Sequence, residues 1–250
     1  MCCVLSVAAA SQDRGYKVLE LEGNGVRWQA RAGWPRPIVS YAVAEHDVEF
    51  PGARNCRKMT SLDRLLSASG IAPATLHREI AAAFALWEAA ADISFRPAAS
   101  AEHADILIGA QIEPEGWAFA DVFYDSASRE PVKSISKSLI CLNPARRWKV
   151  GFDGDLRAYD VRYTIAHEIG HAIGLDHPSG SGQIMGYRYE EAFRELQAGD
   201  VAGAVLLYGE RRPESEMAGS VTQAGRERRF APAGTNLKRW GSRAFSPRPQ

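Results

Sequence analysis

The stretch HEIGHAIGLDH, from His167 to His177, decides both the predicted fold and the predicted chemistry of this chain. Two histidines four positions apart on a helix differ by about 40° around its axis and lie roughly 6 Å apart along it, so His167 and His171 can reach one point. Gly174 lets the chain turn out of the helix, because glycine adopts left-handed conformations without a steric penalty. The turn can return His177 as a third nitrogen ligand, and three protein ligands that leave a position for water are typical of catalytic zinc.

Glu168 follows the first of these histidines directly. It lies about 100° round the helix from His167, so its carboxylate is aimed beside the metal and not at it. A general base that takes a proton from water would stand there. The alternative is an amphipathic helix that carries two histidines by chance, and the added glycine and third histidine argue against it.

The stretch resembles the HExxHxxGxxH signature of the metzincin zinc endopeptidases. Ile184-Met185-Gly186 is similar to the methionine turn of that family, with Met185 eight positions after His177. This spacing, and the run from Leu196 to Gly209, resemble the matrixin branch. From Ile38 to Gly209, the resemblance implies an α+β fold with a twisted mixed sheet, two long helices in an N-terminal subdomain, the methionine turn and a C-terminal helix. Met185 would then form an apolar floor beneath the zinc.

Two residues near this turn depart from the matrixin pattern. Pro178 resembles the serralysins, and Tyr187 resembles both serralysins and astacins, in which a tyrosine two positions after the methionine approaches the zinc. A phenol with a proton to give can stabilise an oxyanion. Tyr187 is therefore a candidate catalytic residue, and packing at the surface is the alternative.

The expected metal is a single catalytic Zn2+. Matrixins hold a second, structural zinc through an aspartate and three histidines, and this chain has no histidine between Asp105 and Ala166. Asp121 and Asp125 could contribute to a Ca2+ site, but nothing supports calcium and surface carboxylates are the favoured interpretation. By the same resemblance, Asp200 would tie the last helix to the methionine turn, and a helix cap is an equal alternative.

Composition favours one domain with tails. The chain has 250 residues, 46% of them hydrophobic, and a formal net charge of zero. These values support a sizeable core and give no indication of nucleic acid as a partner. No apolar run approaches the roughly 20 residues that span a bilayer. We divide the chain into an N-terminal segment (1–30), a catalytic domain (31–210) that we expect to be monomeric, and a disordered tail (211–250) rich in Arg, Pro, Gly and Ser.

The N-terminus and the cysteines bear on location. Residues 1–11 have a short apolar core that ends in three alanines, like the remnant of a secretory signal, although the basic leading segment is missing. A frayed terminus is the alternative. Cys56 and Cys141 are either a disulfide or two buried thiols. Together these features predict a secreted or periplasmic protein.

Hydrophobic periodicity indicates the main elements. It predicts strands at 38–44, 93–97, 104–110, 117–124 and 138–143, and helices at 62–67, 74–91 and from Asp160 onward. Residues 12–38 are hard to assign. Residues 45–72 form a long insertion that we expect to be held locally through Cys56.

We therefore expect a zinc-dependent endopeptidase that hydrolyses peptide bonds in proteins by a zinc-activated water, with Glu168 as general base. The alternative is an inactive, zinc-dependent protein-binding module of the same fold, against which the retained Glu168 argues because binding alone needs no base. A site with two histidines and a downstream glutamate ligand is disfavoured because His177 completes the set locally.

Overall fold

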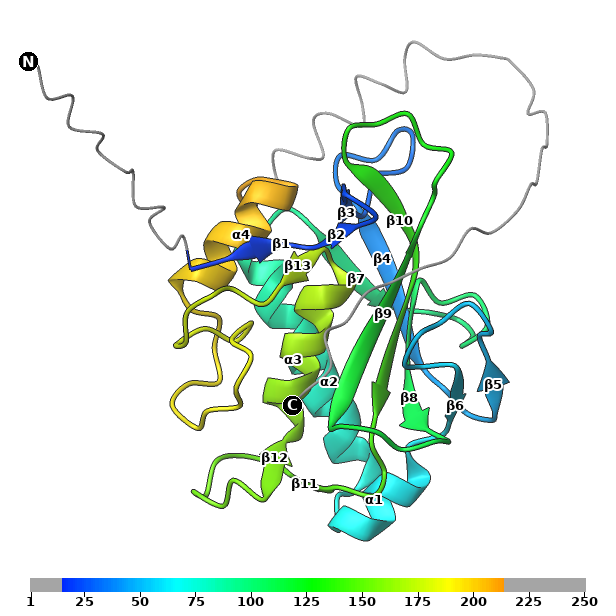
Figure 1. The fold of residues 1–250 in the computed structure, drawn as a ribbon, viewed down its shortest axis with the longest axis vertical. Coiled ribbons are helices and arrows are strands. Elements are labelled where there is room, and N and C mark those ends of the chain that lie inside the picture. The colour runs from blue at the N-terminus through cyan, green and yellow to red at the C-terminus, as the bar shows by residue number, and fades with distance from the viewer. Residues whose placement is uncertain (1–14, 214–250) are drawn as a thin grey trace, which may run out of the picture.

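The computed structural model describes residues 15–213. Within them, helices cover one face of a twisted mixed sheet of nine strands. The insertion contributes two of these strands, β5 and β6, and its loop packs against the other face (Figure 1). This arrangement confirms the predicted α+β fold.

Five strands make up the part of the sheet nearest the site. β4 (Ile38–Val43) pairs in parallel with β7 (Ser94–Pro97) and β8 (Ile106–Gln111), and β8 pairs in parallel with β10 (Lys133–Leu142). β9 (Ala118–Tyr124) runs antiparallel to β10 and, among the described strands, has no second neighbour. Every residue of β8 is buried, as expected for a central parallel strand covered on both faces.

Three longer helices pack on one face of the sheet. α2 (Pro73–Ala90) presents an apolar stripe at three- and four-residue spacing and matches the prediction; the stripe consists of Leu76, Ile80, Ala83, Phe84 and Trp87. α3 (Val161–Ala172) begins at Asp160, whose carboxylate accepts a hydrogen bond from the backbone N–H of Tyr163 at 2.9 Å. α4 (Ala198–Tyr208) completes the layer.

The unassigned N-terminal region forms three short strands. β1 (Lys17–Val18) pairs with β13 (Leu175–Asp176), while β2 (Glu20–Leu21) and β3 (Asn24–Arg27) form a hairpin whose second strand joins β10. Strands of two to four residues are too short to show an alternating pattern, and two of them pair with segments distant in sequence. These strands precede residue 31 but pair with β13 and β10. We therefore propose that the catalytic domain includes them.

The insertion is organised by a short helix, a hairpin and a disulfide. α1 (Asp63–Ser69) lies near the predicted position, and β5 (Val48–Glu49) pairs with β6 (Lys58–Thr60), which joins β8. Cys56 and Cys141 form a disulfide that joins the insertion to β10, with the two Cα atoms 5.6 Å apart. The expected local attachment through Cys56 is therefore present.

Asp121 corrects one of our expectations. It is fully buried on β9 and accepts hydrogen bonds from the backbone N–H groups of Arg54, Asn55 and Cys56 at 3.0, 2.8 and 2.8 Å. The interpretation of Asp121 as a surface carboxylate was wrong, because its charge organises the insertion loop; Asp125 is exposed. We do not propose calcium at either residue.

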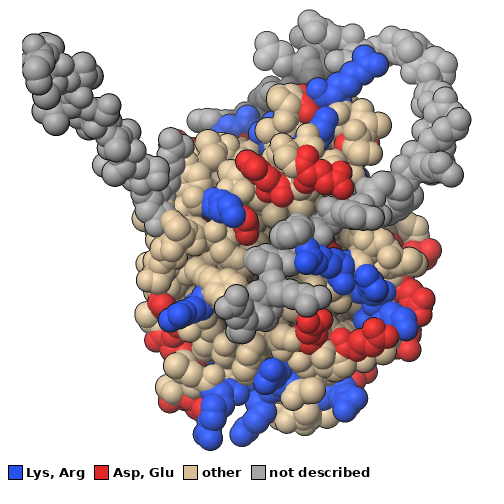
Figure 2. All heavy atoms as spheres, viewed as in Figure 1, with Lys and Arg blue, Asp and Glu red and all other residues tan. Residues whose placement is uncertain are grey.

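Charged residues lie intermingled on the face shown in Figure 2, with basic and acidic side chains as neighbours. Within residues 15–213, no helix is both long enough and apolar enough to cross a membrane.

The first residues of the predicted tail contact the folded domain. Arg212 donates to Asp92 from Nε at 2.6 Å, and the same carboxylate pairs with Arg36 at 3.1 Å. The side chains of Asp92 and Arg36 are both buried. The rest of the tail, and the signal-like segment at residues 1–11, lie outside the described residues.

Asp92→Ala should lower the free energy of unfolding by about 3 kcal/mol, because it removes the carboxylate that pairs with a buried arginine. Urea denaturation measures the change. Glu113→Ala is the matched control: it breaks the pair with Lys58, in which both side chains are largely exposed, and should leave the free energy of unfolding close to that of the parent. Equal effects of the two substitutions would contradict the argument.

Candidate active site

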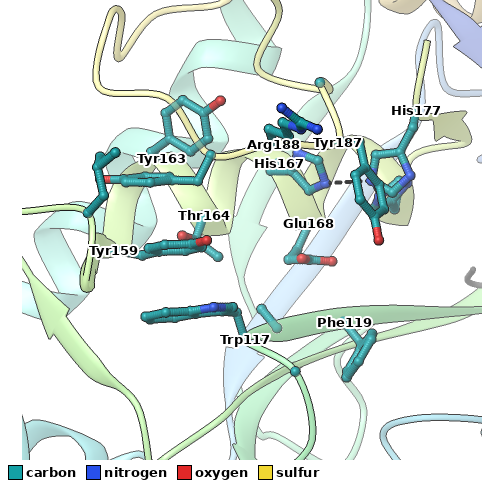
Figure 3. A pocket seen from close by; sticks show the side chains of 16 residues that line it. Trp117, Phe119, Tyr159, Tyr163, Thr164, His167, Glu168, His177, Tyr187 and Arg188 are labelled. Atoms are coloured by element: carbon teal, nitrogen blue, oxygen red, sulfur yellow. Dashed lines mark hydrogen bonds between the residues drawn. The ribbon is translucent and has the colours of Figure 1, made fainter. Parts of the chain in front are cut away.

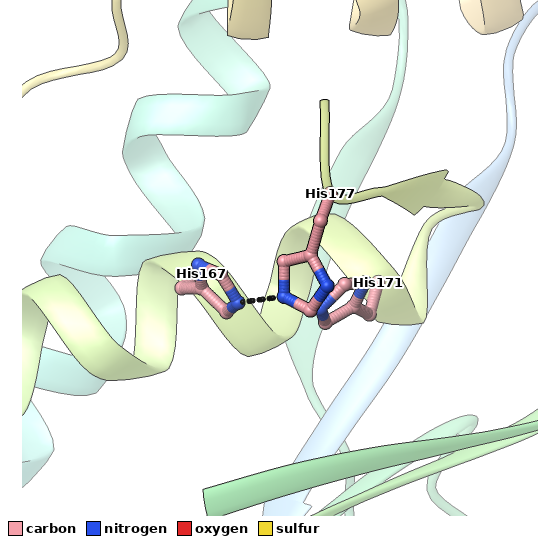
Figure 4. A group of neighbouring side chains, drawn as sticks. All are labelled: His167, His171 and His177. Atoms are coloured by element: carbon pink, nitrogen blue, oxygen red, sulfur yellow. Dashed lines mark hydrogen bonds between the residues drawn. The ribbon is translucent and has the colours of Figure 1, made fainter. Parts of the chain in front are cut away.

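The structure brings the three predicted histidines together. His167 and His171 lie on α3, and His177 follows β13 (Figure 4). The Nε2 atom of His177 is 3.0 Å from that of His167 and 3.2 Å from that of His171. One ligand atom from each residue falls within a group no wider than 4.8 Å.

The other ring nitrogens show that this cluster fits a cation. Nδ1 of His167 lies 2.6 Å from the carbonyl oxygen of Ile184, and Nδ1 of His171 lies 2.8 Å from that of Leu175. A carbonyl only accepts, so each Nδ1 carries the proton and each Nε2 keeps its lone pair. Those two lone pairs both face His177. Tetrahedral zinc with bonds of about 2.05 Å separates its ligand nitrogens by about 3.3 Å, close to the observed spacing.

Burial favours the neutral form of all three rings. Together with a smaller contribution from the neighbouring histidines, burial lowers the pKa of His167 to about 3 and the pKa values of His171 and His177 to about 4. Neutral imidazole is the form that binds a metal. The cluster therefore needs no deprotonation near neutral pH before it can hold an ion.

The turn that returns His177 requires glycine. Gly174 has a φ of +105°, and a Cβ placed there would lie 2.2 Å from the carbonyl oxygen of Val26 in β3. Any side chain would therefore meet both backbone strain and a steric clash. The predicted role of Gly174 at the end of the helix is consistent with this geometry.

Met185 packs directly beneath α3. Its side chain is buried, and a Cβ at Gly170 would lie 2.1 Å from its sulfur. The fully buried Asp200 accepts hydrogen bonds from the N–H groups of Ile184 and Met185 at 2.8 and 3.0 Å. It also accepts one from Gln197 at 2.8 Å, within a capping box at the start of α4. Asp200 therefore ties the last helix to the methionine turn, as the resemblance implies, and it caps that helix from the third helical position while Gln197 is the N-cap residue.

Glu168 faces the cavity beside the histidines (Figure 3). Only 6% of the residue is exposed. Burial raises the pKa of this carboxyl to about 8, and the negative charge of Asp121 adds to the rise. The carboxyl group thus lies next to the cluster without belonging to it, as the helical spacing predicts.

Tyr187 lies at the rim of the same cavity (Figure 3). Its ring stands edge-on to His177, with 5.2 Å between the ring centroids, and 53% of the residue is exposed. The exposed surface position and the closeness to the histidines, which we treated as alternatives, thus occur together.

The cavity has a volume of about 500 Å³. Its aromatic wall was not predicted from the sequence. Trp117 stacks on Tyr159 with centroids 3.6 Å apart, and Tyr159 stacks on Tyr189 at 4.0 Å. All three residues line the cavity together with His167 and Glu168. They come from three separate segments and show no common spacing, so no sequence signal could have joined them.

Comparison with known proteins agrees with this geometry. The family model described as Matrixin matches residues 64–209. The chain belongs to the matrixin family. This matrixin is 31% identical to Metalloendoproteinase 1-MMP of Arabidopsis thaliana over 70% of its own length and 44% of the plant protein. It is 38% identical to Matrix metalloproteinase-19 of Mus musculus over 25% of its length, and 36% identical to the 72 kDa type IV collagenase of Gallus gallus over 33%.

The chain spans less than half of each of these relatives, 12% of the mouse and chicken proteins and 44% of the plant protein. The resemblance found in the sequence is confirmed at the level of the family. Matrixins are zinc metalloendopeptidases, and three histidines of this matrixin lie close enough together to bind a metal.

His177→Ala should weaken zinc retention by at least about a hundredfold, because two imidazoles form an incomplete tetrahedral site. Competition with a chromophoric chelator measures the affinity. His103→Ala is the control, since His103 is exposed and its Nδ1 lies 3.0 Å from the hydroxyl of Ser100. Unchanged zinc affinity in His177→Ala would show that the third ligand comes from another residue.

Proposed function

We propose that this matrixin is a zinc-dependent endopeptidase that hydrolyses peptide bonds in proteins. His167, His171 and His177 would hold the zinc, and Glu168 would act as general base. One observation carries the proposal: three convergent Nε2 atoms lie beside a buried carboxyl group in a single cavity.

When bound, zinc supplies a Lewis acid that polarises a peptide carbonyl and lowers the pKa of a water to about 7. Glu168 accepts a proton from the attacking water and passes it to the leaving nitrogen. Its place one residue from His167 on a rigid helix keeps the carboxylate near the reacting atoms. Tyr187 at the rim is positioned to donate its hydroxyl proton to the developing oxyanion.

The substrate is proposed to be an extended segment of protein. β9 has one open edge among the described strands, so a peptide can add there through backbone hydrogen bonds. The stacked rings of Trp117, Tyr159 and Tyr189 form an apolar wall for a substrate side chain. This combination gives affinity through the backbone and selectivity through the cavity.

An inactive, zinc-dependent binding module of the same fold remains the second candidate. The position of Glu168 favours the enzyme. Burying a carboxyl group is unfavourable, and a site that only binds its ligand does not need one there. We also propose a secreted or periplasmic location and a monomeric state. The disulfide supports that location, since such bonds persist in oxidising compartments.

Glu168→Gln should retain zinc and lower the rate of casein hydrolysis about a hundred- to ten-thousandfold, because only the base is removed. Zinc content and initial rates are measured on the same preparation. Glu113→Gln, which alters an exposed carboxylate, serves as the control. Near-normal activity in the zinc-loaded Glu168→Gln protein would reject this residue as the base.

Tyr187→Phe should lower kcat on the order of tenfold to a thousandfold, with KM and zinc content little changed, if the hydroxyl stabilises the oxyanion. Phenylalanine keeps the ring and its contact with His177, so the comparison isolates the hydroxyl group. Steady-state kinetics with a fluorogenic peptide provide the measurement. A kcat within about twofold of the parent would leave Tyr187 with a packing role only.

A further inference from the structure

A largely covered ammonium group is linked to the aromatic wall of the cavity through Glu191 and Tyr189. Lys149 ends β11 (Arg147–Lys149), which pairs in parallel with β12 (Ala158–Asp160). Its Nζ atom lies 2.5 Å from Oε1 of Glu191 and 2.9 Å from the carbonyl oxygen of Asp155, and it also pairs with the carboxylate of Asp153. The Lys149 side chain is 12% exposed and that of Glu191 is 8% exposed, so the pair is shielded from water.

Glu191 joins two segments distant in sequence. One carboxylate oxygen accepts hydrogen bonds from the N–H groups of Asp153 and Gly154 at 3.1 and 2.7 Å. The other accepts the hydroxyl of Tyr189 at 2.8 Å. The loop before α3 and the segment after Met185 are therefore held by a single carboxylate, whose charge is balanced by Lys149.

Tyr189 connects this ion pair to the cavity. Its hydroxyl oxygen accepts the N–H of Asp160 at 2.8 Å, directly before α3. Its ring stacks on Tyr159, which stacks on Trp117, and the interplanar angles are 15° and 4°. With its hydroxyl held at both Asp160 and Glu191, the side chain cannot swing away from the cavity without breaking a hydrogen bond. Trp117 and Tyr159 lie on the side of the cavity away from His177 (Figure 3), and Tyr189 lines the same cavity.

We propose that Lys149 and Glu191 are positioning residues that fix the aromatic wall of the substrate cavity. The stretch from Asp105 to Ala166 contains no histidine. In the loop that follows β11, the ammonium group of Lys149 supplies the positive charge that binds the carboxylates of Glu191 and Asp153 and the carbonyl oxygen of Asp155. The effect on substrate rests on the proposed function; the effect on the wall itself does not.

Removing one partner of a shielded ion pair leaves the other charge uncompensated. Lys149→Met keeps most of the apolar stem and removes only the ammonium, so Glu191 would move toward water and release Tyr189. Tyr189→Phe is a milder second variant, because it keeps the ring and removes only the hydroxyl link. Arg157→Met is the matched control: Arg157 lies in the same loop and pairs with Asp155, but its side chain is 89% exposed.

The first experiment measures amide hydrogen exchange in zinc-free protein and involves no catalysis. The amides of Asp153, Gly154 and Asp160 donate to Glu191 or Tyr189. In Lys149→Met, peptides that span residues 151–160 should exchange at least about tenfold faster than in the parent, because these bonds open locally. Arg157→Met should stay within about twofold. Parent-like exchange in Lys149→Met would overturn the proposal.

The second experiment uses the zinc-loaded full chain and two peptides that differ only by leucine or alanine at the residue entering the cavity. Lys149→Met and Tyr189→Phe should raise KM for the leucine peptide about tenfold and reduce the preference for leucine, with kcat within about twofold. Arg157→Met should match the parent.

The two proposals fail in different ways. A parent protein with bound zinc and no hydrolysis would reject the proposed function, while the exchange experiment would still decide the role of Lys149. An active parent whose variants keep the KM and the leucine preference would overturn the positioning role alone. If Lys149→Met does not fold, Tyr189→Phe decides by the same criteria.

Discussion

The Nε2 atoms of His167 and His171 lie 3.0 and 3.2 Å from Nε2 of His177, and the rest of the structure depends on this arrangement of three imidazole nitrogens. Two of them present lone pairs to the third, which is unfavourable unless a cation lies between them. The surrounding protein supplies the constraint from three sides: carbonyl groups hold two of the rings, Met185 packs beneath the helix, and the turn at Gly174 directs His177 back. These contacts orient the three imidazole rings toward one point.

Buried carboxylates perform much of the remaining organisation. Asp200 holds the methionine turn, Asp121 holds the insertion loop, and Asp160 starts α3 while also accepting the N–H of Gly151 at 2.6 Å. Each accepts backbone N–H groups from loops that would otherwise leave polar atoms unpaired away from water. The irregular segments near the cavity are thus fixed by charge-assisted hydrogen bonds, whereas the sheet and helices are fixed by apolar packing.

This division explains what the sequence could predict. Helical and alternating spacing located α2, α3 and five strands (β4, β7, β8, β9 and β10), and the spacing of the three histidines located their cluster, because these features are local. Local patterns carry no information about which distant groups meet. The stack of Trp117 on Tyr159, the pairing of Lys149 with Glu191 and the burial of Asp121 all join residues from separate segments. These contacts can be identified only from the three-dimensional structure.

The N-terminal segment before residue 31 contacts the end of α3. The carbonyl oxygen of Val26 lies against Gly174, where no side chain fits. The indole N–H of Trp28 donates to the carbonyl of Ala172 at 2.9 Å. This carbonyl lies in the last turn of α3, where carbonyl groups receive no N–H from their own helix. Lys17 pairs with Asp176 at 2.6 Å, immediately before His177. Residues 17–28 therefore contact both the last turn of α3 and the segment that leads to His177. A fold that began at residue 31 would keep two histidines on a helix and lose these contacts beside the third.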